Sequence, residues 1–218
     1  MKASPKPSRT SSNGRRKSAV VVRTHTAEPV RRQERTIHFL TQDELRRLFK
    51  VMKSKRDKAI FLVAYRHGLR ASEIGLLRRA DVDTKQGRVS IHRLKGSISG
   101  VYPMQPDVLK AIRSYLRTRA DESPYLFLSN RQVPMSRYML HHLMQTYGEV
   151  AGLPLEKRKF HCLKHSIATH LLDAGADLAF VKDWLGHANI QNTTIYARLT
   201  TATLDSTARK VFASHRVV

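Results

Sequence analysis

Apolar residues spaced three and four positions apart dominate the chain after Thr41. Thr41 and Glu44 are spaced as a capping box, and the apolar pattern that follows them predicts that a helix begins there. Further helices are predicted over 57–67, 71–78, 106–119, 136–151, 161–174, 177–186 and 191–198. Gly68 is expected to end the first of these. Most of the chain after residue 40 is therefore predicted to be helical.

One short stretch alternates instead. Val89 and Ile91 lie on the same side of segment 88–94, and an extended pattern resumes at 101–104. Glycines and serines between the two stretches are typical of a turn, which places Lys95 near its tip. The predicted fold class is mainly α with a small antiparallel β-sheet, in the form of a hairpin.

The two ends of the chain depart from this pattern. Residues 1–36 are rich in Ser, Pro and Thr, carry ten lysines and arginines against two acidic residues, and show no sustained apolar period. This composition is typical of a basic disordered tail. One folded domain is expected over 37–205. Beyond it, the C-terminal segment 206–218 continues an apolar helical stripe formed by Leu204, Ala208, Val211 and Phe212.

The charge of the chain favours a polyanionic partner. Its 218 residues include 40 Lys and Arg against 17 Asp and Glu, which gives a formal net charge of +23 and a pI near 10.9. The tail contributes +8 (ten minus two), so +15 belongs to the rest, and nucleic acid is the expected partner. An anionic membrane is the alternative, but the longest apolar run, 59–65, is far shorter than the roughly 20 residues of a spanning helix. No signal-peptide pattern opens the chain, so a cytoplasmic protein is expected.

The first candidate motif is Gly68-Leu69-Arg70-Ala71-Ser72-Glu73, which places an arginine between two predicted helices. The paired N–H groups of a guanidinium at such a boundary suit two phosphate oxygens. Glu73, three residues on, either holds this side chain or caps the following helix, and the pattern leaves both roles open.

The second motif is His161-Cys162-Leu163-Lys164-His165, in which residues 161, 164 and 165 share one helical face. A metal site at the two histidines is disfavoured, because no carboxylate follows His161 and Lys164 would repel the cation. His165 is expected to be a packed histidine that supports its neighbours. Cys162 is the only cysteine, which excludes an internal disulfide and a multi-cysteine zinc site, and it is expected to fill the core.

The third motif is Leu185-Gly186-His187, followed nine residues later by Tyr196. Together the series Gly-Leu-Arg-x-Ser-Glu, a hairpin lysine, His-x-Leu-basic-His, Leu-Gly-His and a late tyrosine resembles the catalytic domain of tyrosine recombinases, the phage-integrase family. The resemblance covers residues 37–205. Within that family, the segment Ile91-His92-Arg93-Leu94-Lys95 and the short chain are most similar to the Fim-type DNA invertases.

The resemblance implies cleavage and rejoining of DNA strands without metal, nucleotide or other cofactor. Tyr196 would attack a backbone phosphate and form a 3′-phosphotyrosyl link. Side chains would then neutralise the charge of the transition state. The implied roles are phosphate contacts for Arg70, Lys164 and His187, proton removal from Tyr196 for His161, protonation of the leaving 5′-oxygen for Lys95, and support for Glu73 and His165.

The resemblance also implies a biological setting. The partner would be double-stranded DNA, on which four copies of the chain assemble into a homo-tetramer in the bacterial nucleoid. The outcome would be integration, excision or inversion. In relatives a terminal segment packs on a neighbouring protomer, and for segment 206–218 packing on its own domain is equally open.

Lys164 departs from the family pattern, which has a second arginine at this position. A lysine keeps the charge but offers a point contact in place of a fork, unless Arg158 or Lys159 compensates. Losing one well-placed donor costs roughly 3–4 kcal/mol, and replacing arginine by lysine should cost less. The alternative to an active recombinase is therefore a DNA-binding regulator of the same fold with weak or no catalysis. A type IB topoisomerase ranks last, because of the Fim-like hairpin.

Overall fold

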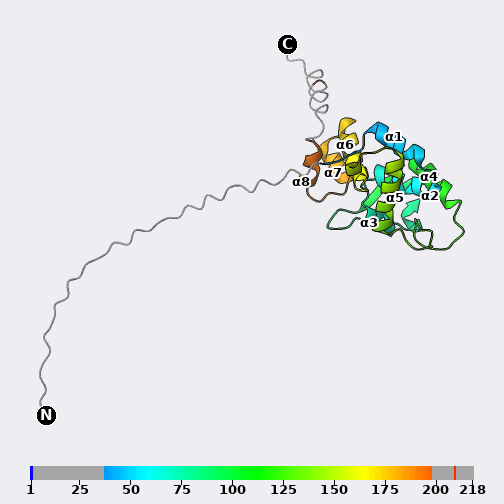
Figure 1. Ribbon diagram of the computed structural model, residues 1–218, viewed down its shortest axis with the longest axis horizontal. Helices are drawn as coiled ribbons and strands as arrows, with labels where there is room; N and C mark the ends of the chain where they lie inside the picture. Colours follow the sequence, from blue (N-terminus) through cyan, green and yellow to red (C-terminus); the bar gives the residue numbers. More distant parts are fainter. Residues whose placement is uncertain (2–36, 198–208, 210–218) are drawn as a thin grey trace. The chain divides into compact units, whose positions relative to one another are not determined.

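The computed structural model describes residues 37–197 together with Met1 and Arg209. The predicted tail 1–36, apart from Met1, lies outside the described residues, as does the C-terminal segment 206–218 apart from Arg209. The described elements, in chain order, are α1 (Gln42–Val51), α2 (Lys55–Arg66), α3 (Ala71–Leu76), η1 (Arg79–Asp81), β1 (Val82–Asp83), β2 (Arg88–Ile91), β3 (Gly100–Pro103), α4 (Pro106–Leu116), α5 (Arg137–Val150), η2 (Leu155–Lys157), α6 (Cys162–Asp173), α7 (Leu178–Trp184) and α8 (Gln191–Ala197) (Figure 1).

Side-chain caps fix where the helices begin. The Thr41 hydroxyl accepts a hydrogen bond from the Glu44 amide at 3.2 Å, and the Glu44 carboxylate accepts one from the Thr41 amide at 2.8 Å, so the predicted capping box is confirmed. Helix α2 begins two residues before the predicted start, because the Ser54 hydroxyl caps it. It ends where predicted, at Gly68, whose φ of +58° few other residues adopt readily.

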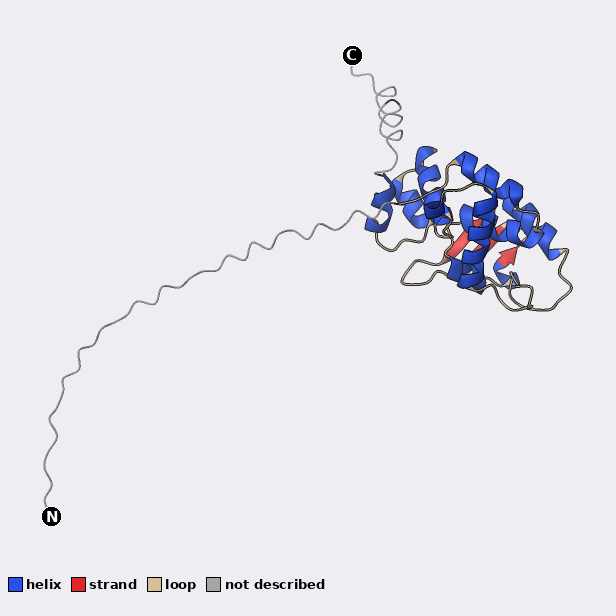
Figure 2. Cartoon of the chain, in the orientation of Figure 1, coloured by secondary structure: helices blue, strands red, loops and turns tan. Residues whose placement is uncertain are grey.

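The small sheet has the antiparallel order β1-β2-β3, and Figure 2 shows how little of the chain its strands occupy. The predicted hairpin is confirmed, with Val89 opposite Tyr102 and Ile91 opposite Gly100. Strand β1 was not predicted, because its two residues are too short to show an alternating pattern.

Helix α2 lies at the centre of the core, where it packs against α4 and α6. Ala59, Ile60 and Phe61 on this helix are fully buried. The Phe61 ring packs edge-on against the Phe160 ring, with 5.4 Å between the ring centroids. The longest apolar run of the sequence is therefore a buried helix. None of the described helices is long and apolar enough to cross a membrane. Cys162 is also fully buried, as predicted for a residue that fills the core.

Candidate active site

The candidate residues lie on four segments that meet around α6. These segments are the α2–α3 junction with Arg70 and Glu73, the β2–β3 loop with Lys95, the start of α6 with His161, Lys164 and His165, and the stretch from the end of α7 through α8 with His187 and Tyr196. Helix α6 contacts both α7 and α8. The fold therefore gathers residues that are up to 126 positions apart in the sequence (196 minus 70).

Tyr196 lies on the inner face of α8, with only 2% of its surface exposed. Its hydroxyl lies 2.8 Å from Nδ1 of His165. Burial raises the pKa of the Tyr196 phenol well above its usual value, although the positive charge of Arg70 acts in the opposite direction. The phenol is therefore neutral in the absence of a ligand, and its nearest proton acceptor is an imidazole.

The partner of the tyrosine hydroxyl differs from the implied one. The resemblance implies proton removal by His161, but His161 is the exposed N-cap of α6. Its ring packs edge-on against the His165 ring, with 5.3 Å between the two ring centroids. His165 lies one turn further into the helix, where α8 packs against α6. Burial, followed by the charges of His161 and Lys164, lowers the pKa of His165 to about 4, so its imidazole is neutral near pH 7.

Arg70 and Glu73 form a tight pair at the start of α3. The Glu73 carboxylate accepts hydrogen bonds from the Arg70 amide at 2.8 Å and from Nη1 of Arg70 at 2.9 Å. Both roles left open for Glu73 are therefore present, since it caps the helix and holds the guanidinium. Burial acts to raise the pKa of Glu73, but the hydrogen bond from the Arg70 amide and the charge of Arg93 outweigh it, so the pKa lies below its usual value.

Lys164 is 5% exposed, and its Nζ donates a hydrogen bond to the carbonyl of Leu185 at 3.0 Å. Burial, and after it the charges of Arg93 and Arg70, lower the pKa of Lys164 to about 7. The lysine that replaces the usual arginine is thus partly uncharged near neutral pH. Arg158, one of the two residues proposed to compensate, donates from its Nε to the carbonyl of Leu153 at 2.8 Å, and its Nη1 lies 3.8 Å from the Glu149 carboxylate.

His187 follows the turn at Gly186, whose φ is +66°. Its Nδ1 lies 2.9 Å from the hydroxyl of Thr193, a fully buried residue of α8. Burial, followed by the charges of Lys164 and Arg70, lowers the pKa of His187 to about 4. Thr193 was not predicted as a site residue, although its place one helical turn before Tyr196 puts it on the same face of α8.

Lys95 lies at the tip of the β2–β3 loop, as predicted, and is exposed. It has a φ of +58°, which is uncommon for a residue other than glycine. Within the described part of the chain, its ammonium group has no hydrogen-bond or ion-pair partner. The Lys95 ammonium is therefore available to a ligand at the rim of the site.

Arg93 was missed by the sequence prediction. Its side chain is fully buried and contacts the carbonyls of His67, Gly68 and Trp184. A signal was available, because Arg93 continues the alternation of Val89 and Ile91 and therefore falls on the buried side of the strand pattern.

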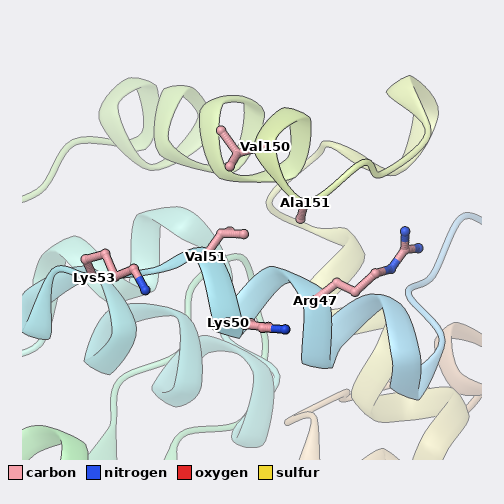
Figure 3. A pocket seen from close by; sticks show the side chains of 6 residues that line it. All are labelled: Arg47, Lys50, Val51, Lys53, Val150 and Ala151. Carbon is pink, nitrogen blue, oxygen red and sulfur yellow. The ribbon is translucent and has the colours of Figure 1, made fainter.

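The described residues offer no group of metal ligands, and their basic hollow lies apart from the candidate residues. Within the described residues, no group of three or more histidine, cysteine, aspartate or glutamate side chains is arranged to hold a metal ion. A basic hollow of about 490 Å³ lies between α1 and the end of α5, and Figure 3 shows its cations. It is lined by Arg47, Lys50, Val51, Lys53, Val150 and Ala151, so none of the candidate residues belongs to it.

Comparison with known proteins identifies similar chains. Residues 38–203 match the model of the Phage integrase family. The tyrosine recombinase XerA of Pyrococcus horikoshii is 37% identical over 174 residues, which cover 78% of this chain and 60% of the relative. The type 1 fimbriae regulatory protein FimB of Escherichia coli K12 is 36% identical over 167 residues, which cover 73% of this chain and 83% of the relative. The chain thus spans about 60% of the length of the XerA relative.

Solved structures share the fold. The crystal structure of XerA recombinase has a TM-score of 0.68 and 30% identity, over 83% of this chain and 65% of that chain. A post-cleavage complex of XerH site-specific recombinase with its palindromic difH substrate has a TM-score of 0.67 and 22% identity, over 79% of this chain and 53% of that one. The predicted fold class, mainly helical with a small antiparallel sheet, is confirmed.

The low pKa of Lys164 predicts a specific dependence of stability on pH. Its pKa is about 7 in the folded chain against 10.5 as the ordinary value, so between these values the unfolded chain binds more protons. Stability should therefore rise with pH from about 7 to 10 relative to a Lys164→Met variant, whereas below pH 7 the difference should be constant. Urea unfolding of both proteins at pH 6, 8 and 9.5 measures this. The control is Lys58→Met at an exposed position, which should follow the wild type; parallel curves for Lys164→Met would contradict the burial of a titrating ammonium.

Proposed function

The chain belongs to the phage integrase family, and from this we propose that it is a site-specific recombinase that cleaves and rejoins DNA through Tyr196. The observation that carries the proposal is the position of the Tyr196 hydroxyl. It is buried at 2.8 Å from Nδ1 of His165, and the positive charge of Arg70 acts to lower its pKa. The catalytic domain would comprise residues 37–205.

The proposed cleavage step needs charge rather than an external energy source. A bond forms between the Tyr196 oxygen and phosphorus, while the bond from phosphorus to the 5′-oxygen breaks. The phosphotyrosyl link conserves the energy of the broken bond, so the released 5′-hydroxyl can reverse the step on a partner strand. Arg70, Lys164 and His187 would stabilise the negative charge on the non-bridging oxygens.

Two proton transfers accompany this step. The proton of the Tyr196 hydroxyl would pass to Nδ1 of His165, because this nitrogen already lies at hydrogen-bond distance and the ring is neutral. His161, the implied acceptor, would instead act through the His165 ring, which it contacts edge-on. Lys95 would protonate the leaving 5′-oxygen, a role that suits a rim cation without a partner in the described chain.

The substrate and assembly follow from charge and from the relatives. Double-stranded DNA is the proposed substrate, since the chain carries +23 and the solved relatives include recombinases bound to DNA. We also propose that four copies of the chain assemble on DNA, with segment 206–218 packing on a neighbour or on its own domain. Residues 1–36 would form a basic tail, and the protein would lie in the nucleoid. The resemblance of segment 91–95 to the Fim-type invertases favours a local invertase, and this chain covers 83% of the length of FimB.

A second candidate function rests on Lys164. Because this lysine is partly uncharged near pH 7, one transition-state cation is weaker than in relatives with an arginine. A DNA-binding regulator with slow cleavage would have the same fold and the same basic surface. Covalent chemistry separates the two candidates.

Replacing Tyr196 tests the proposed nucleophile. Duplexes selected from a random pool for binding, then nicked at successive positions to trap the product, should give an SDS-resistant adduct with the wild type. Tyr196→Phe should lose the adduct to below detection, because a phenyl ring has no attacking oxygen. Tyr138→Phe, at a residue 80% exposed on α5, should keep it. Tight binding by the wild type without any adduct would favour the regulator, and an adduct in Tyr196→Phe would move the nucleophile elsewhere.

Restoring an arginine tests the assignment of Lys164. Lys164→Arg should form the adduct at least as fast as the wild type, because arginine stays charged and offers a fork. Its advantage should grow with pH and stay below about tenfold at pH 8, the limit set by the pKa of about 7 without ligand, because a bound phosphate raises the pKa of the wild-type lysine. Single-turnover rates at pH 6, 7 and 8 measure this. A sharp loss at every pH would show that the pocket is shaped for lysine.

The identity of the proton acceptor is open to a matched pair of variants. His165→Asn places an amide oxygen near the position of Nδ1, which keeps a hydrogen bond but cannot take a proton. Cleavage should fall by roughly 100-fold or more and should rise with pH as hydroxide takes over. His161→Asn should lose less than about tenfold, and both variants should bind DNA as the wild type does. The reverse order of losses would return the role to His161.

A further inference from the structure

Arg93 is a charged residue in a fully buried position just after β2. Its side chain has no exposed surface. Nη1 donates to the carbonyl of Gly68 at 2.9 Å, and Nη2 donates to the carbonyls of His67 at 2.8 Å and Trp184 at 3.0 Å. Nη1 also lies 3.4 Å from the Glu73 carboxylate. One guanidinium therefore joins the segment of His67 and Gly68, the segment of Trp184 and its own segment, and it also faces a buried acid.

Each of these segments carries a candidate catalytic residue. Gly68 lies two positions before Arg70, Trp184 lies three before His187, and Arg93 itself lies two before Lys95. Arg70, His187 and Lys95 are thus fixed relative to one another through Arg93, which is not one of the candidate catalytic residues. The chemistry suits an arginine, which has five N–H donors in a planar fork and no acceptor, because backbone carbonyls only accept.

The loop that carries Lys95 is held on both sides of its tip. Four hydrogen bonds anchor it: the Leu94 amide to Glu73 at 3.3 Å, the Arg93 amide to the Ser99 hydroxyl at 3.0 Å, the Ile98 amide to the carbonyl of Gly186 at 2.9 Å, and Nη1 of Arg70 to the Ser97 hydroxyl at 3.1 Å. Between these anchors, Lys95 and Gly96 have φ values of +58° and +69°. A lysine keeps such a backbone conformation only where its surroundings impose it.

The turn at Gly186 completes this arrangement. A Cβ on Gly186 would lie 2.6 Å from the carbonyl oxygen of Ile98 and 3.0 Å from Nε of Arg93. The lysine loop, Arg93 and the turn before His187 are therefore in direct contact, with no room for a side chain between them. A shift in one of the three must move the others.

Burial of the Arg93 charge costs free energy. Its charge faces one carboxylate at 3.4 Å, and its Nε has no hydrogen-bond partner among the described residues. Apolar residues of similar volume often replace buried ion pairs without loss of stability. They would, however, leave three carbonyls unpaired and release the loop.

We propose that Arg93 is a positioning residue for Lys95, holding the β2–β3 loop so that the lysine ammonium meets the leaving 5′-oxygen. The inference rests on the proposed recombinase function. The effect of Arg93 on the leaving oxygen would be exerted through the loop that carries Lys95. Without it, Lys95 would lose its place at the leaving oxygen, and the missing proton would slow the breaking of the bond to phosphorus.

The test uses a substrate that does not need this proton. A duplex with sulfur in place of the bridging 5′-oxygen has a leaving thiolate, which departs without a general acid. On ordinary DNA, Arg93→Met and Arg93→Lys should slow single-turnover cleavage by roughly 100-fold, as should Lys95→Met. On the sulfur-substituted duplex, all three should come within about threefold of the wild type. Arg117→Met, which removes an exposed arginine on the far end of α4, should change neither rate.

Folding and binding are measured alongside. Thermal unfolding and DNA affinity of the variants should show a folded protein with wild-type affinity at the assay temperature. Should Arg93→Met not fold, Ser99→Ala serves in its place, because it loosens the same loop without leaving a buried charge unpaired. It should show a smaller loss, about tenfold, that the sulfur substrate removes.

Equal losses on both substrates, in Arg93→Lys or in Ser99→Ala, would overturn the inference, because a general effect on the fold or on Arg70 does not depend on the leaving group. Wild-type rates for the Arg93 variants on ordinary DNA would overturn it as well. A wild type that cleaves neither substrate would overturn the proposed function itself, and Tyr196→Phe, which the sulfur substrate should not rescue, distinguishes that failure from the others.

Discussion

A single buried carboxylate, that of Glu73, holds the candidate site together. It accepts hydrogen bonds from the amide and guanidinium of Arg70, from the amide of Leu94, and, at longer distance, from Arg93. Two arginines and the lysine loop therefore converge on one negative charge. Without it, the cations would repel one another in a region with little water, and burial would favour opening of the site. The acid that begins α3 is thus also the acid that makes a cationic pocket possible.

Three further basic groups of the site carry less positive charge than their residue types suggest, because their pKa values are lowered. The pKa values of His165 and His187 lie near 4 and that of Lys164 near 7, in each case through burial first and neighbouring cations second. In the absence of a ligand the two histidines are therefore neutral and Lys164 is partly so, which leaves fewer positive charges for Glu73 to balance. A phosphate group bound at the proposed site would bring negative charge to the same place, which would raise these pKa values and draw in protons. Charge would then appear where and when the transition state requires it, which reduces the cost of keeping the site folded between reactions.

Sequence reasoning predicted the helices because their caps and apolar spacing are local, as at Thr41 and Ser136. It placed Lys95 at a turn and Arg70 at a helix boundary for the same reason. The resemblance assigned proton removal to His161 and support to His165, and spacing could not test this choice, since both lie on one face of α6 and only the packing of α8 decides which one meets Tyr196. The choice of Tyr196 itself came from its place after Leu-Gly-His and from the family pattern. Arg93 was missed because burial of a charge depends on carbonyls up to 91 residues away.

The presence of Arg93 in the pocket offers a reason for a lysine, in place of an arginine, at position 164. The planar fork of a guanidinium is already present in the pocket, where Arg93 binds three carbonyls. Lys164 meets one carbonyl, that of Leu185, so two of its three ammonium protons remain for a ligand. Without a bound phosphate, a second guanidinium would bring five donors into this buried space, and any that stayed unpaired would lower the stability of the folded chain rather than the rate of cleavage. Structural anchoring would thus fall to an arginine and contact with a ligand to a lysine, whose pKa is lowered by burial first and by the charges of Arg93 and Arg70 second.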